Sequence, residues 1–218
     1  MNIFDVHIKN GEVIDGTGAP KFKSDIVIDK GKIIGVFPPE NGDARDPSEN
    51  HFLSNFKAKH TINAESKIIS PGFIDVHTHD DDNVFLDPSM SSKISQGVTT
   101  CVAGNCGISL APFSYKGEVP APIALLGKSE VFRFPRVSDY KEEFDNKPSS
   151  VNLALLTGHS MLRVEAMNGE FARPATTKEI SKMVDKLKLA LEDGSIGLST
   201  GLAYPAANDA PSSEIIEL

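Results

Sequence analysis

The stretch Val151–Thr200, VNLALLTGHSMLRVEAMNGEFARPATTKEISKMVDKLKLALEDGSIGLST, decides the fold. It opens and closes on short apolar runs, 151–158 and 195–200, each of a length typical of a buried strand. Between them, within 176–194, apolar residues recur at the spacing of one helix face. A strand, a helix and a strand in this order predict parallel β/α units, and therefore an α/β fold.

The predicted helix carries a signal at each end. Thr176 and Glu179 stand three residues apart ahead of the apolar positions, which is the pattern of a capping box. Gly194 follows the last turn, where a glycine commonly ends a helix. We therefore expect the helix to begin just after Thr176 and to end just before Gly194.

Two apolar runs further upstream, 72–77 and 98–104, predict other strands of the same kind. The region that follows them is less regular, with a candidate strand at 120–127 and polar helix or loop at 138–146. A closed (β/α)8 barrel takes about 250 residues, so the segment 71–218 is long enough for about four or five of its units. We expect an incomplete barrel of that size.

The first 70 residues are instead rich in β signals. Alternating apolar residues flank Asn10-Gly11 and again Lys30-Gly31, and we expect a hairpin turn at each pair. The stretch 37–50 is polar and rich in proline, which predicts a loop, and 60–72 supplies another short strand.

This contrast in pattern predicts two domains. Residues 1–70 form a small antiparallel β unit, and residues 71–218 form the β/α segment. The last residues, APSSEIIEL, resemble the start of a helix, with a proline, a serine and an acidic first turn. We therefore expect the chain to be the first part of a larger protein.

Composition narrows the classes of function. The net charge is −8, the pI is near 5.2, and no dense cluster of Lys and Arg occurs, which argues against binding to nucleic acid or to an anionic membrane. No stretch approaches the roughly 20 apolar residues of a membrane span, and the N-terminus lacks the pattern of a signal peptide. With two cysteines and no export signal, we expect a cytoplasmic protein with reduced thiols.

The stretch Ser70–Asp82, SPGFIDVHTHDDD, places His77 and His79 where a predicted strand gives way to a loop. Side chains two apart on a strand share one face, at roughly 6.6 Å along the strand, so the two imidazoles can converge on one cation or on two adjacent ones. This favours a metal site, with Asp75 one step deeper as support for the ligands. A pair of solvated loop histidines is the alternative.

A second candidate ligand lies in GVTTCVAGNCG, residues 97–107. Cys106 would follow the end of its strand, on the same rim as the two histidines. Thiolate is a strong ligand for Zn²⁺, and the flanking glycines allow the backbone to bend close to an ion. Taken alone, Cys106 is better interpreted as structural; together with the histidines it favours a metal ligand. Cys101, inside the strand, is expected to pack in the core.

Three further residues follow the later strands. Arg163 could pair with a substrate carboxylate through its fork of donors, or form a salt bridge within the scaffold. His159 could be a ligand, a polarising group or a histidine that is hydrogen-bonded in the rim, and the residues alone favour the last. Tyr204 could donate to a carbonyl or carboxylate oxygen, or simply pack with its hydroxyl in water.

These motifs follow one another in the order seen in the N-acyl-D-amino-acid deacylases (D-aminoacylases) of the amidohydrolase superfamily. The resemblance is carried by SPGFIDVHTHDD, GVTT with VAGNCGISLAP, TGHSMLR, ARPATTKEISKM and GSIGLSTGLAYP, and the opening DVHIKNGEVIDGTGAP resembles the family's first β segment. It covers nearly the whole chain. The Asn-Cys-Gly loop discriminates best, since hydantoinase and dihydroorotase relatives typically use a carboxylated lysine where the deacylases place a cysteine.

The resemblance implies a β-sandwich beside a (β/α)8 barrel, zinc as cofactor and a small N-acyl amino acid as substrate. It makes His77, His79 and Cys106 metal ligands. It places Tyr204 in the substrate pocket, and Arg163 and His159, which match a recurring family motif, are further substrate-binding candidates. A zinc-activated water would hydrolyse the amide bond to a carboxylate and a free D-amino acid, with an aspartate as general base and acid.

Members of that family are more than twice as long, and their later strands supply further metal-binding histidines and the catalytic aspartate. No histidine follows His159 here. The resemblance therefore implies the N-terminal part of such an enzyme, inactive alone, with those residues expected beyond Leu218. The alternatives are a cyclic-amide hydrolase of the hydantoinase or dihydroorotase kind, and a non-catalytic, degenerate fragment of the same fold.

Overall fold

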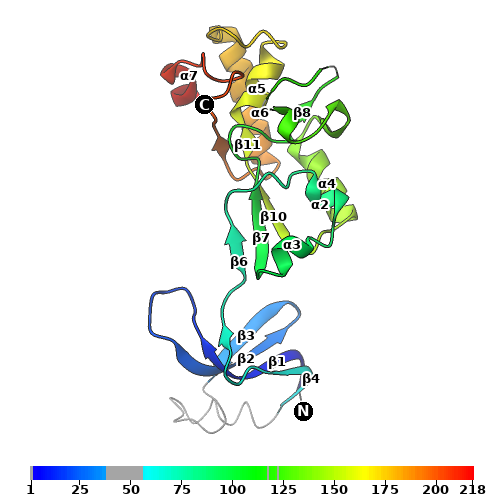
Figure 1. Cartoon of the computed structure of the whole chain (residues 1–218), viewed down its shortest axis with the longest axis vertical. Helices are drawn as coiled ribbons and strands as arrows, with labels where there is room; N and C mark the ends of the chain where they lie inside the picture. Colours follow the sequence, from blue (N-terminus) through cyan, green and yellow to red (C-terminus); the bar gives the residue numbers. More distant parts are fainter. Residues whose placement is uncertain (1, 38–55, 117, 122) are drawn as a thin grey trace. The chain divides into compact units, whose positions relative to one another are not determined.

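The structure is a computed structural model that describes residues 2–37, 56–116, 118–121 and 123–218. The chain divides into two compact units, Met1–Pro71 and Gly72–Leu218. The described part of the first unit is built of strands, whereas the second alternates strands and helices (Figure 1). Apart from Phe37, the loop predicted at 37–50 lies outside the described residues.

The first unit contains a five-stranded sheet of order β3-β2-β1-β4, with β5 also paired to β1. Its strands are β1 (Asn2–Val13), β2 (Phe22–Asp29), β3 (Lys32–Phe37), β4 (Phe56–Asn63) and β5 (Ile68–Ile69). β2 runs antiparallel to β1 and β3, but β4 and β5 run parallel to β1. The prediction of an antiparallel unit is therefore wrong for β4 and β5.

The two Gly-containing pairs of this unit behave differently. Lys30-Gly31 forms the predicted two-residue turn between β2 and β3, and both residues have positive φ. Asn10-Gly11 instead lies inside β1, where the register with β2 shifts and a bulge forms. The buried Asp25 carboxylate accepts a hydrogen bond from the Asn10 amide at 2.9 Å, which holds the bulge. The hairpin prediction at Asn10-Gly11 is wrong because such a pair serves a bulge as well as a turn.

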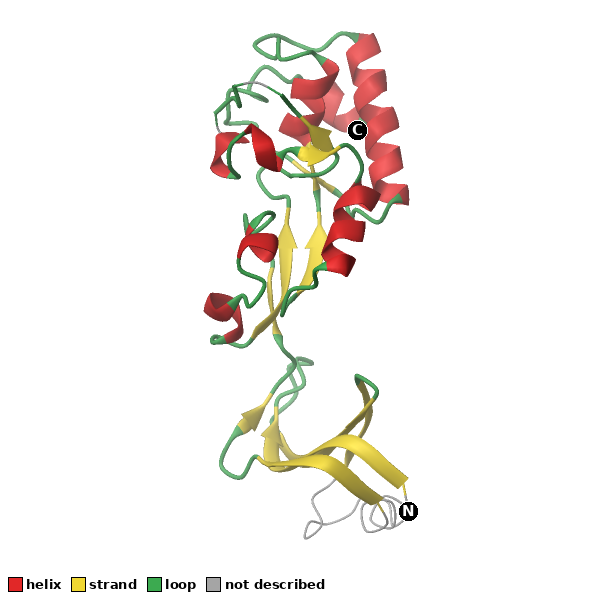
Figure 2. Ribbon diagram, turned by 90° about the vertical axis from the view of Figure 1, so that its right-hand side faces the viewer, coloured by secondary structure: helices red, strands yellow, loops and turns green. Residues whose placement is uncertain are grey.

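Parallel strands follow one another in chain order through the second unit (Figures 1 and 2). β6 (Phe73–Asp75), β7 (Val98–Ala103) and β10 (Asn152–Leu155) form a parallel sheet of order β10-β7-β6. β11 (Thr157–Gly158) comes directly after β10 and pairs in parallel with β12 (Leu198–Ser199). The predicted α/β fold and its parallel pairing are confirmed.

The connections between these strands carry the helices. They are α2 (Asn83–Leu86), α3 (Ser91–Ile94), α4 (Val137–Asn146), α5 (His159–Ala166), α6 (Thr177–Glu192) and α7 (Ser212–Glu217). The polar stretch 138–146 is helical, within α4. The candidate strand at 120–127 is wrong: a 3-10 helix, Ile123–Leu125, lies there, and a second one spans Ser129–Val131. None of the helices in the described residues has the length and apolar character to span a bilayer.

An antiparallel pair of short strands, β8 (Phe113–Ser114) and β9 (Arg133–Phe134), lies between β7 and α4 in the chain. Their phenylalanines belong to the main core of the unit, together with Cys101 and Ala103 of β7. Cys101 is fully buried, as predicted for a small packed side chain. Burial of apolar area at about 25 cal/mol per Å² makes this cluster the main source of stability in the unit.

The helix predicted between Thr176 and Gly194 is confirmed as α6, which begins and ends as its caps require. Thr176 and Glu179 form the capping box, with the Thr176 amide donating to the Glu179 carboxylate at 2.7 Å. The apolar face of α6 presents Met183 and Leu187 to Leu162 of α5, which forms a second, smaller core cluster. α6 thereby fixes α5, and with it the loops at the carboxyl ends of the strands.

Candidate metal site

His77 and His79 lie just beyond β6, at the carboxyl end of the parallel sheet. Thr78, between them, points the other way and is buried, and its amide and hydroxyl donate to the Val102 carbonyl of β7 at 3.1 and 3.2 Å. This anchor leaves both imidazoles on the opposite side, with their ring centroids 5.9 Å apart. The spacing of two residues therefore does bring the rings together.

Cys106 reaches the same place from the loop after β7. Its Sγ lies 3.0 Å from His77 Nε2. One ligand atom from each of His77, His79 and Cys106 lies within 4.8 Å of the other two. Among the described residues, these three alone form so compact a group of histidine, cysteine and carboxylate side chains. The structure thus brings together the three ligands that the sequence proposes.

The backbone of the Asn-Cys-Gly loop is bent sharply to present this thiol. Gly104, Cys106 and Gly107 all have positive φ, at 78°, 56° and 76°. For the cysteine this conformation costs roughly 1–2 kcal/mol, so its surroundings must enforce it. Asn105 does so from inside the loop: it is buried, and its amide nitrogen donates to the Val102 carbonyl at 2.8 Å.

The later strands hold the loop from outside. The Gly107 amide donates to Ser199 Oγ of β12 at 3.0 Å, and that hydroxyl donates in turn to the Gly104 carbonyl. The Ser160 amide, in the first turn of α5, donates to the Gly107 carbonyl at 2.9 Å. A Cβ at Gly104 would lie 2.0 Å from the Leu156 carbonyl oxygen, so the loop and β10/β11 approach as closely as only glycine allows.

The electrostatics of His79 favour its ligand form. Burial, and then the neighbouring His77, lower the pKa of His79, so its ring stays neutral at pH 7. The Nδ1 atom of His79 is buried and has no hydrogen-bond partner among the described residues. An unpaired buried nitrogen is costly, and a bound cation would satisfy it. Two imidazoles and a thiolate are a donor set that fits Zn²⁺.

Two charged groups beside the site carry no sequence signal. Lys93 of α3 lies 2.8 Å from Asp75 and 3.0 Å from Asp80, so the carboxyl groups flanking the histidines share one ammonium. The hydrogen bond from Lys93 lowers the pKa of Asp75. Asp81 is fully buried, which raises its pKa to about 7, and its carboxylate accepts from the Gly104 amide at 3.3 Å. Asp81 thus supports the Asn-Cys-Gly loop from the buried side.

His159 and Arg163 belong instead to a buried network with Glu214 of α7. All three side chains are fully buried. His159 Nε2 lies 2.7 Å from Glu214 Oε1, and the Arg163 guanidinium binds the same carboxylate with one terminal nitrogen. The prediction from the residues alone, that His159 is hydrogen-bonded within the rim, is confirmed.

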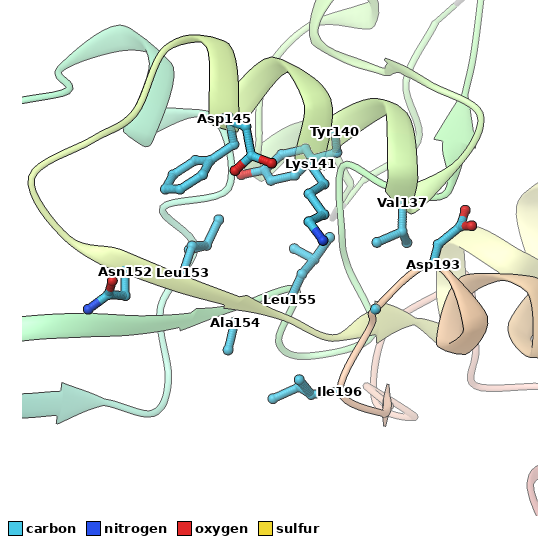
Figure 3. A pocket seen from close by; sticks show the side chains of 12 residues that line it. Val137, Tyr140, Lys141, Asp145, Asn152, Leu153, Ala154, Leu155, Asp193 and Ile196 are labelled. Carbon is cyan, nitrogen blue, oxygen red and sulfur yellow. The ribbon is translucent and has the colours of Figure 1, made fainter. Parts of the chain in front are cut away.

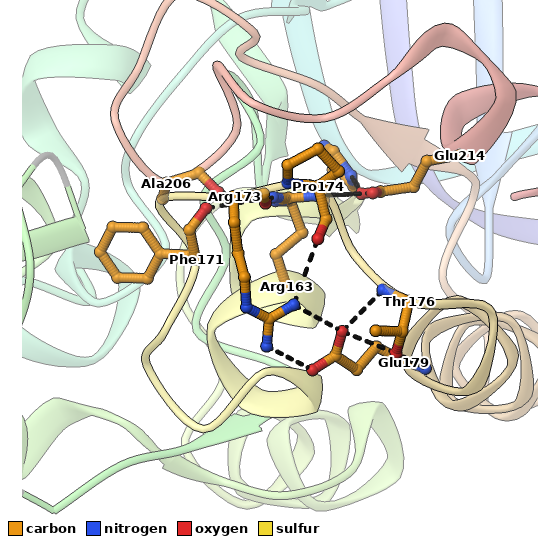
Figure 4. A network of polar contacts seen from close by, with 9 residues as sticks. Arg163, Phe171, Arg173, Pro174, Thr176, Glu179, Ala206 and Glu214 are labelled. Atoms are coloured by element: carbon orange, nitrogen blue, oxygen red, sulfur yellow. Dashed lines mark hydrogen bonds and ion pairs between the residues drawn. The ribbon is translucent and has the colours of Figure 1, made fainter.

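Arg163 uses all five of its donors inside the protein (Figure 4). Besides Glu214, it donates to the carbonyl oxygens of Ala206, Phe171 and Arg173 at 2.9, 3.1 and 2.8 Å. No donor is left for a substrate carboxylate, and the side chain has no exposed surface. Of the two interpretations of Arg163, the scaffold salt bridge is therefore the one that the contacts support, and its assignment to substrate binding is corrected.

Tyr204 does lie next to the loop that carries Cys106. It is half-buried and follows Gly201, and its amide donates to the Gly201 carbonyl at 3.0 Å. A Cβ at Gly201 would meet the Cys106 carbonyl oxygen at 2.1 Å and the Tyr204 ring at 2.6 Å. Gly201 is therefore sandwiched between the loop and the ring, which keeps Tyr204 at the edge of the candidate site.

A separate cavity of about 330 Å³ lies between α4, β10 and the turn before β12 (Figure 3). Tyr140 and Lys141 line it from the helix, Leu155 from the strand, and Asp193 and Ile196 from the turn. Neither the candidate ligands nor Tyr204 contributes to its walls. The cavity therefore does not serve the candidate metal site.

Comparison with known proteins gives a consistent set of relatives. The sequence profile of the amidohydrolase family matches residues 60–215. A D-aminoacylase of Alcaligenes xylosoxydans xylosoxydans is 40% identical over 215 residues, which make up 99% of this chain and 41% of that protein. The chain therefore spans about two fifths of the length of that relative.

Two solved structures are similar throughout the chain. A crystal structure of a D-aminoacylase, described as defining a novel subset of amidohydrolases, matches with a TM-score of 0.86 and 44% identity, over 98% of this chain and 42% of that one. An N-acyl-D-glutamate deacylase from Bordetella bronchiseptica, in complex with zinc and a phosphonate mimic of the tetrahedral intermediate, matches with a TM-score of 0.86 and 39% identity, over 99% and 42% of the two chains.

Proposed function

The chain belongs to the amidohydrolase family, and on that premise we propose that it provides the first metal-binding strands of an N-acyl-D-amino-acid deacylase. The observation that carries the proposal is the convergence of His77, His79 and Cys106 at the carboxyl end of the parallel sheet. The relatives named above act as deacylases by their names, and one was solved with zinc. The proposed reaction adds water to the amide bond and yields a carboxylate and a free D-amino acid.

We propose that His77, His79 and Cys106 together hold Zn²⁺. When bound at such a site, zinc activates water and polarises a carbonyl group. The residues of this chain prepare the site for it: the anchored Thr78 aims both rings, and the strained loop presents the thiol. Because His79 stays neutral at pH 7, its ring nitrogen is available as a ligand without first losing a proton.

Tyr204 is the residue of this chain that we propose to contact substrate. Its position against Gly201 keeps the ring beside the Cys106 loop, and its hydroxyl is a donor suited to a carbonyl or carboxylate oxygen. The chain spans about two fifths of its relatives' length. We propose that the general base and any further metal ligands come from residues outside this chain, so that the activity belongs to the whole protein.

We also propose a finer description of the fold. The parallel strands β6, β7, β10 with β11, and β12 are the first strands of a (β/α)8 barrel, and the first unit is part of a β-sandwich. The order of the strands along the chain, with parallel neighbours throughout, supports the barrel. The corresponding domains are 1–70 and 71–218.

The matched pair of cysteines tests the metal site. We expect Cys106→Ala to lower zinc affinity about 100-fold or more, since even the loss of a group outside the coordination shell costs 10- to 100-fold. Cys101→Ala, at the buried cysteine of β7, should leave zinc affinity unchanged. Metal binding by the two variants is compared in two ways. Mass spectrometry gives the zinc content, and the thiolate-to-cobalt charge-transfer absorption of the Co²⁺ form shows whether a thiolate is a ligand. Equal zinc affinity in both variants would contradict the proposed ligand set.

The reaction itself is tested on the protein expressed together with whatever coding sequence follows Leu218 in frame. We expect metal-dependent release of D-amino acids from N-acetyl-D-amino acids, and none from the L-enantiomers. Hydrolysis of hydantoin or dihydroorotate in their place would point to a cyclic-amide hydrolase. A stably folded protein that binds zinc but hydrolyses neither class would favour the non-catalytic alternative.

A further inference from the structure

Three charged side chains surround the candidate ligands without belonging to them. Asp75 lies two residues before His77, and Asp80 directly follows His79. Lys93, from the short helix α3, lies 2.8 Å from the first carboxylate and 3.0 Å from the second. One ammonium group therefore bridges the two carboxyl groups that flank the histidines in sequence.

This bridge is partly shielded from water. The side chains of Lys93, Asp75 and Asp80 keep 22%, 33% and 18% of their surface exposed. Partly buried ion pairs are screened less than fully exposed ones, so the ammonium restrains both carboxylates. The packing of α3 against β7 fixes the backbone from which Lys93 extends.

The chemistry of the carboxylates makes this restraint relevant to metal choice. Carboxylate oxygens suit hard ions such as Mn²⁺ and Mg²⁺, whereas imidazole and thiolate suit Zn²⁺. Both aspartates stand close enough in the chain to approach an ion held by their neighbouring histidines. In the described structure, however, the compact group of donor atoms includes neither aspartate.

We propose that Lys93 is a positioning residue that holds Asp75 and Asp80 away from the metal, and that it thereby sets the preference of the site for Zn²⁺ over hard divalent ions such as Mn²⁺. The inference rests on the proposed metal site. Lys93 contributes in two ways: it contacts one oxygen of each carboxyl group, and its positive charge offsets part of the negative charge that would attract any divalent cation.

A purely structural role for Lys93 predicts something different. If the ion pairs only hold α3 against the strands, their loss would weaken the binding of all metals by a similar factor. The proposed role predicts a change in the ratio of affinities, because freed carboxylates strengthen Mn²⁺ binding more than Zn²⁺ binding. The ratio of the two dissociation constants therefore distinguishes the two roles.

The test uses Lys93→Met, which keeps most of the side-chain volume without the charge, and Lys93→Arg, which keeps the charge. Dissociation constants for Zn²⁺ and Mn²⁺ are measured by competition with a chelator, and the bound Mn²⁺ is observed by electron paramagnetic resonance. We expect the Zn²⁺ preference to fall about tenfold or more in Lys93→Met, the scale typical of changes just outside a coordination shell. Lys93→Arg should retain the wild-type preference. Lys93→Gln replaces Lys93→Met if the latter does not fold.

Asp75→Asn and Asp80→Asn, combined with Lys93→Met, complete the design. Without the carboxylates, the triple variant should recover the wild-type ratio of affinities. An unchanged ratio in Lys93→Met, or a triple variant that does not recover it, overturns the role of Lys93 while leaving the zinc site intact. If Cys106→Ala binds Zn²⁺ as tightly as the wild type, the proposed metal site is wrong, and the proposed role of Lys93 is wrong as well.

Discussion

His77 and His159 occupy comparable places in the second unit, each just beyond the end of a parallel strand, yet their surroundings are opposite. The His77 side chain is exposed and faces Cys106 Sγ at 3.0 Å. The His159 side chain is fully buried and meets the Glu214 carboxylate at 2.7 Å. The position of a histidine at a strand end therefore does not show that it binds a ligand. What decides this is whether other residues of the protein already form hydrogen bonds with the imidazole ring.

The same contrast extends to the groups around each histidine. In the buried network, Glu214 faces both Arg163 and His159, and the guanidinium has a protein acceptor for each of its donors. At the candidate metal site, His79 Nδ1 is buried with no partner among the described residues. The buried network therefore has no free group for a ligand, whereas a bound cation would give the buried nitrogen of His79 a partner.

The largest expected effect breaks the buried network. Arg163→Met would leave the Glu214 carboxylate buried without its guanidinium partner, and removal of one partner of a buried pair costs about 3–5 kcal/mol. We expect a loss of that size in the free energy of unfolding, measured by urea denaturation, with m unchanged. Metal affinity in the fraction that remains folded should be unaffected.

The control for this substitution is Lys186→Met on α6. Lys186 forms an ion pair with Glu165 of α5, but the pair lies at the surface and should contribute no more than about 1 kcal/mol. If Arg163→Met proved as mild as Lys186→Met, the buried network would not be the scaffold element described above, and a functional role for Arg163 would have to be reconsidered.

Much of this comparison could be predicted from the sequence, because periodicity and local motifs report neighbours along the chain. The parallel strands, α6 with its Thr176 and Glu179 cap, and the joint face of His77 and His79 all follow from spacing. Contacts between residues that are distant in sequence cannot be recognised from such local patterns. Glu214 lies 51 residues beyond Arg163, and nothing near either residue indicates that they meet.

The errors in the first unit have a similar origin. Asn10-Gly11 has the composition of a turn, but the decision between turn and bulge is made by Asp25 on the neighbouring strand. The direction of β4 is set by its pairing with β1, a partner distant in sequence, which a strand pattern does not encode. Beside the metal site, Lys93 belongs to a helix of four residues, too short for periodicity to reveal.

A smaller effect is expected beside the candidate metal site, at Gly201. A methyl group there would overlap the Cys106 carbonyl oxygen and the Tyr204 ring. We expect Gly201→Ala to cost about 1–3 kcal/mol in the free energy of unfolding, the range for overpacking, and also to weaken zinc binding by displacing the loop. Gly169→Ala, at a glycine with open space around it but a φ of +83°, should cost stability through backbone strain alone and leave zinc affinity unchanged. A Gly201→Ala protein with wild-type zinc affinity would show that the ligand loop does not depend on this contact.

The smallest effect concerns the exposed edge of the buried network, where Arg173 binds Glu179 at 2.8 and 2.9 Å while its carbonyl accepts from Arg163. Arg173, and then the Thr176 amide, hold the pKa of Glu179 well below its usual value of 4.5. A carboxyl group whose pKa is lowered by folding stabilises the protein above its unfolded pKa, and this contribution is lost as the pH falls through the folded value. We expect Glu179→Gln to cost about 1 kcal/mol at pH 7, as for the loss of a helix cap.

That cost should shrink as the pH is lowered from about 5 towards 2, because Glu179 of the unfolded chain takes up a proton over this range while the folded carboxylate, with its lowered pKa, stays ionised. Thermal or urea unfolding of Glu179→Gln and wild type over this pH range gives the difference directly. Glu192→Gln, at an exposed carboxyl group at the other end of α6, serves as the matched control and should show no such trend. A cost for Glu179→Gln that stayed constant with pH would mean that the charge of Glu179 is not what stabilises this end of α6. The exposed edge of the buried network would then be stabilised by packing alone, whereas its centre is stabilised by the pairing of Arg163 with Glu214.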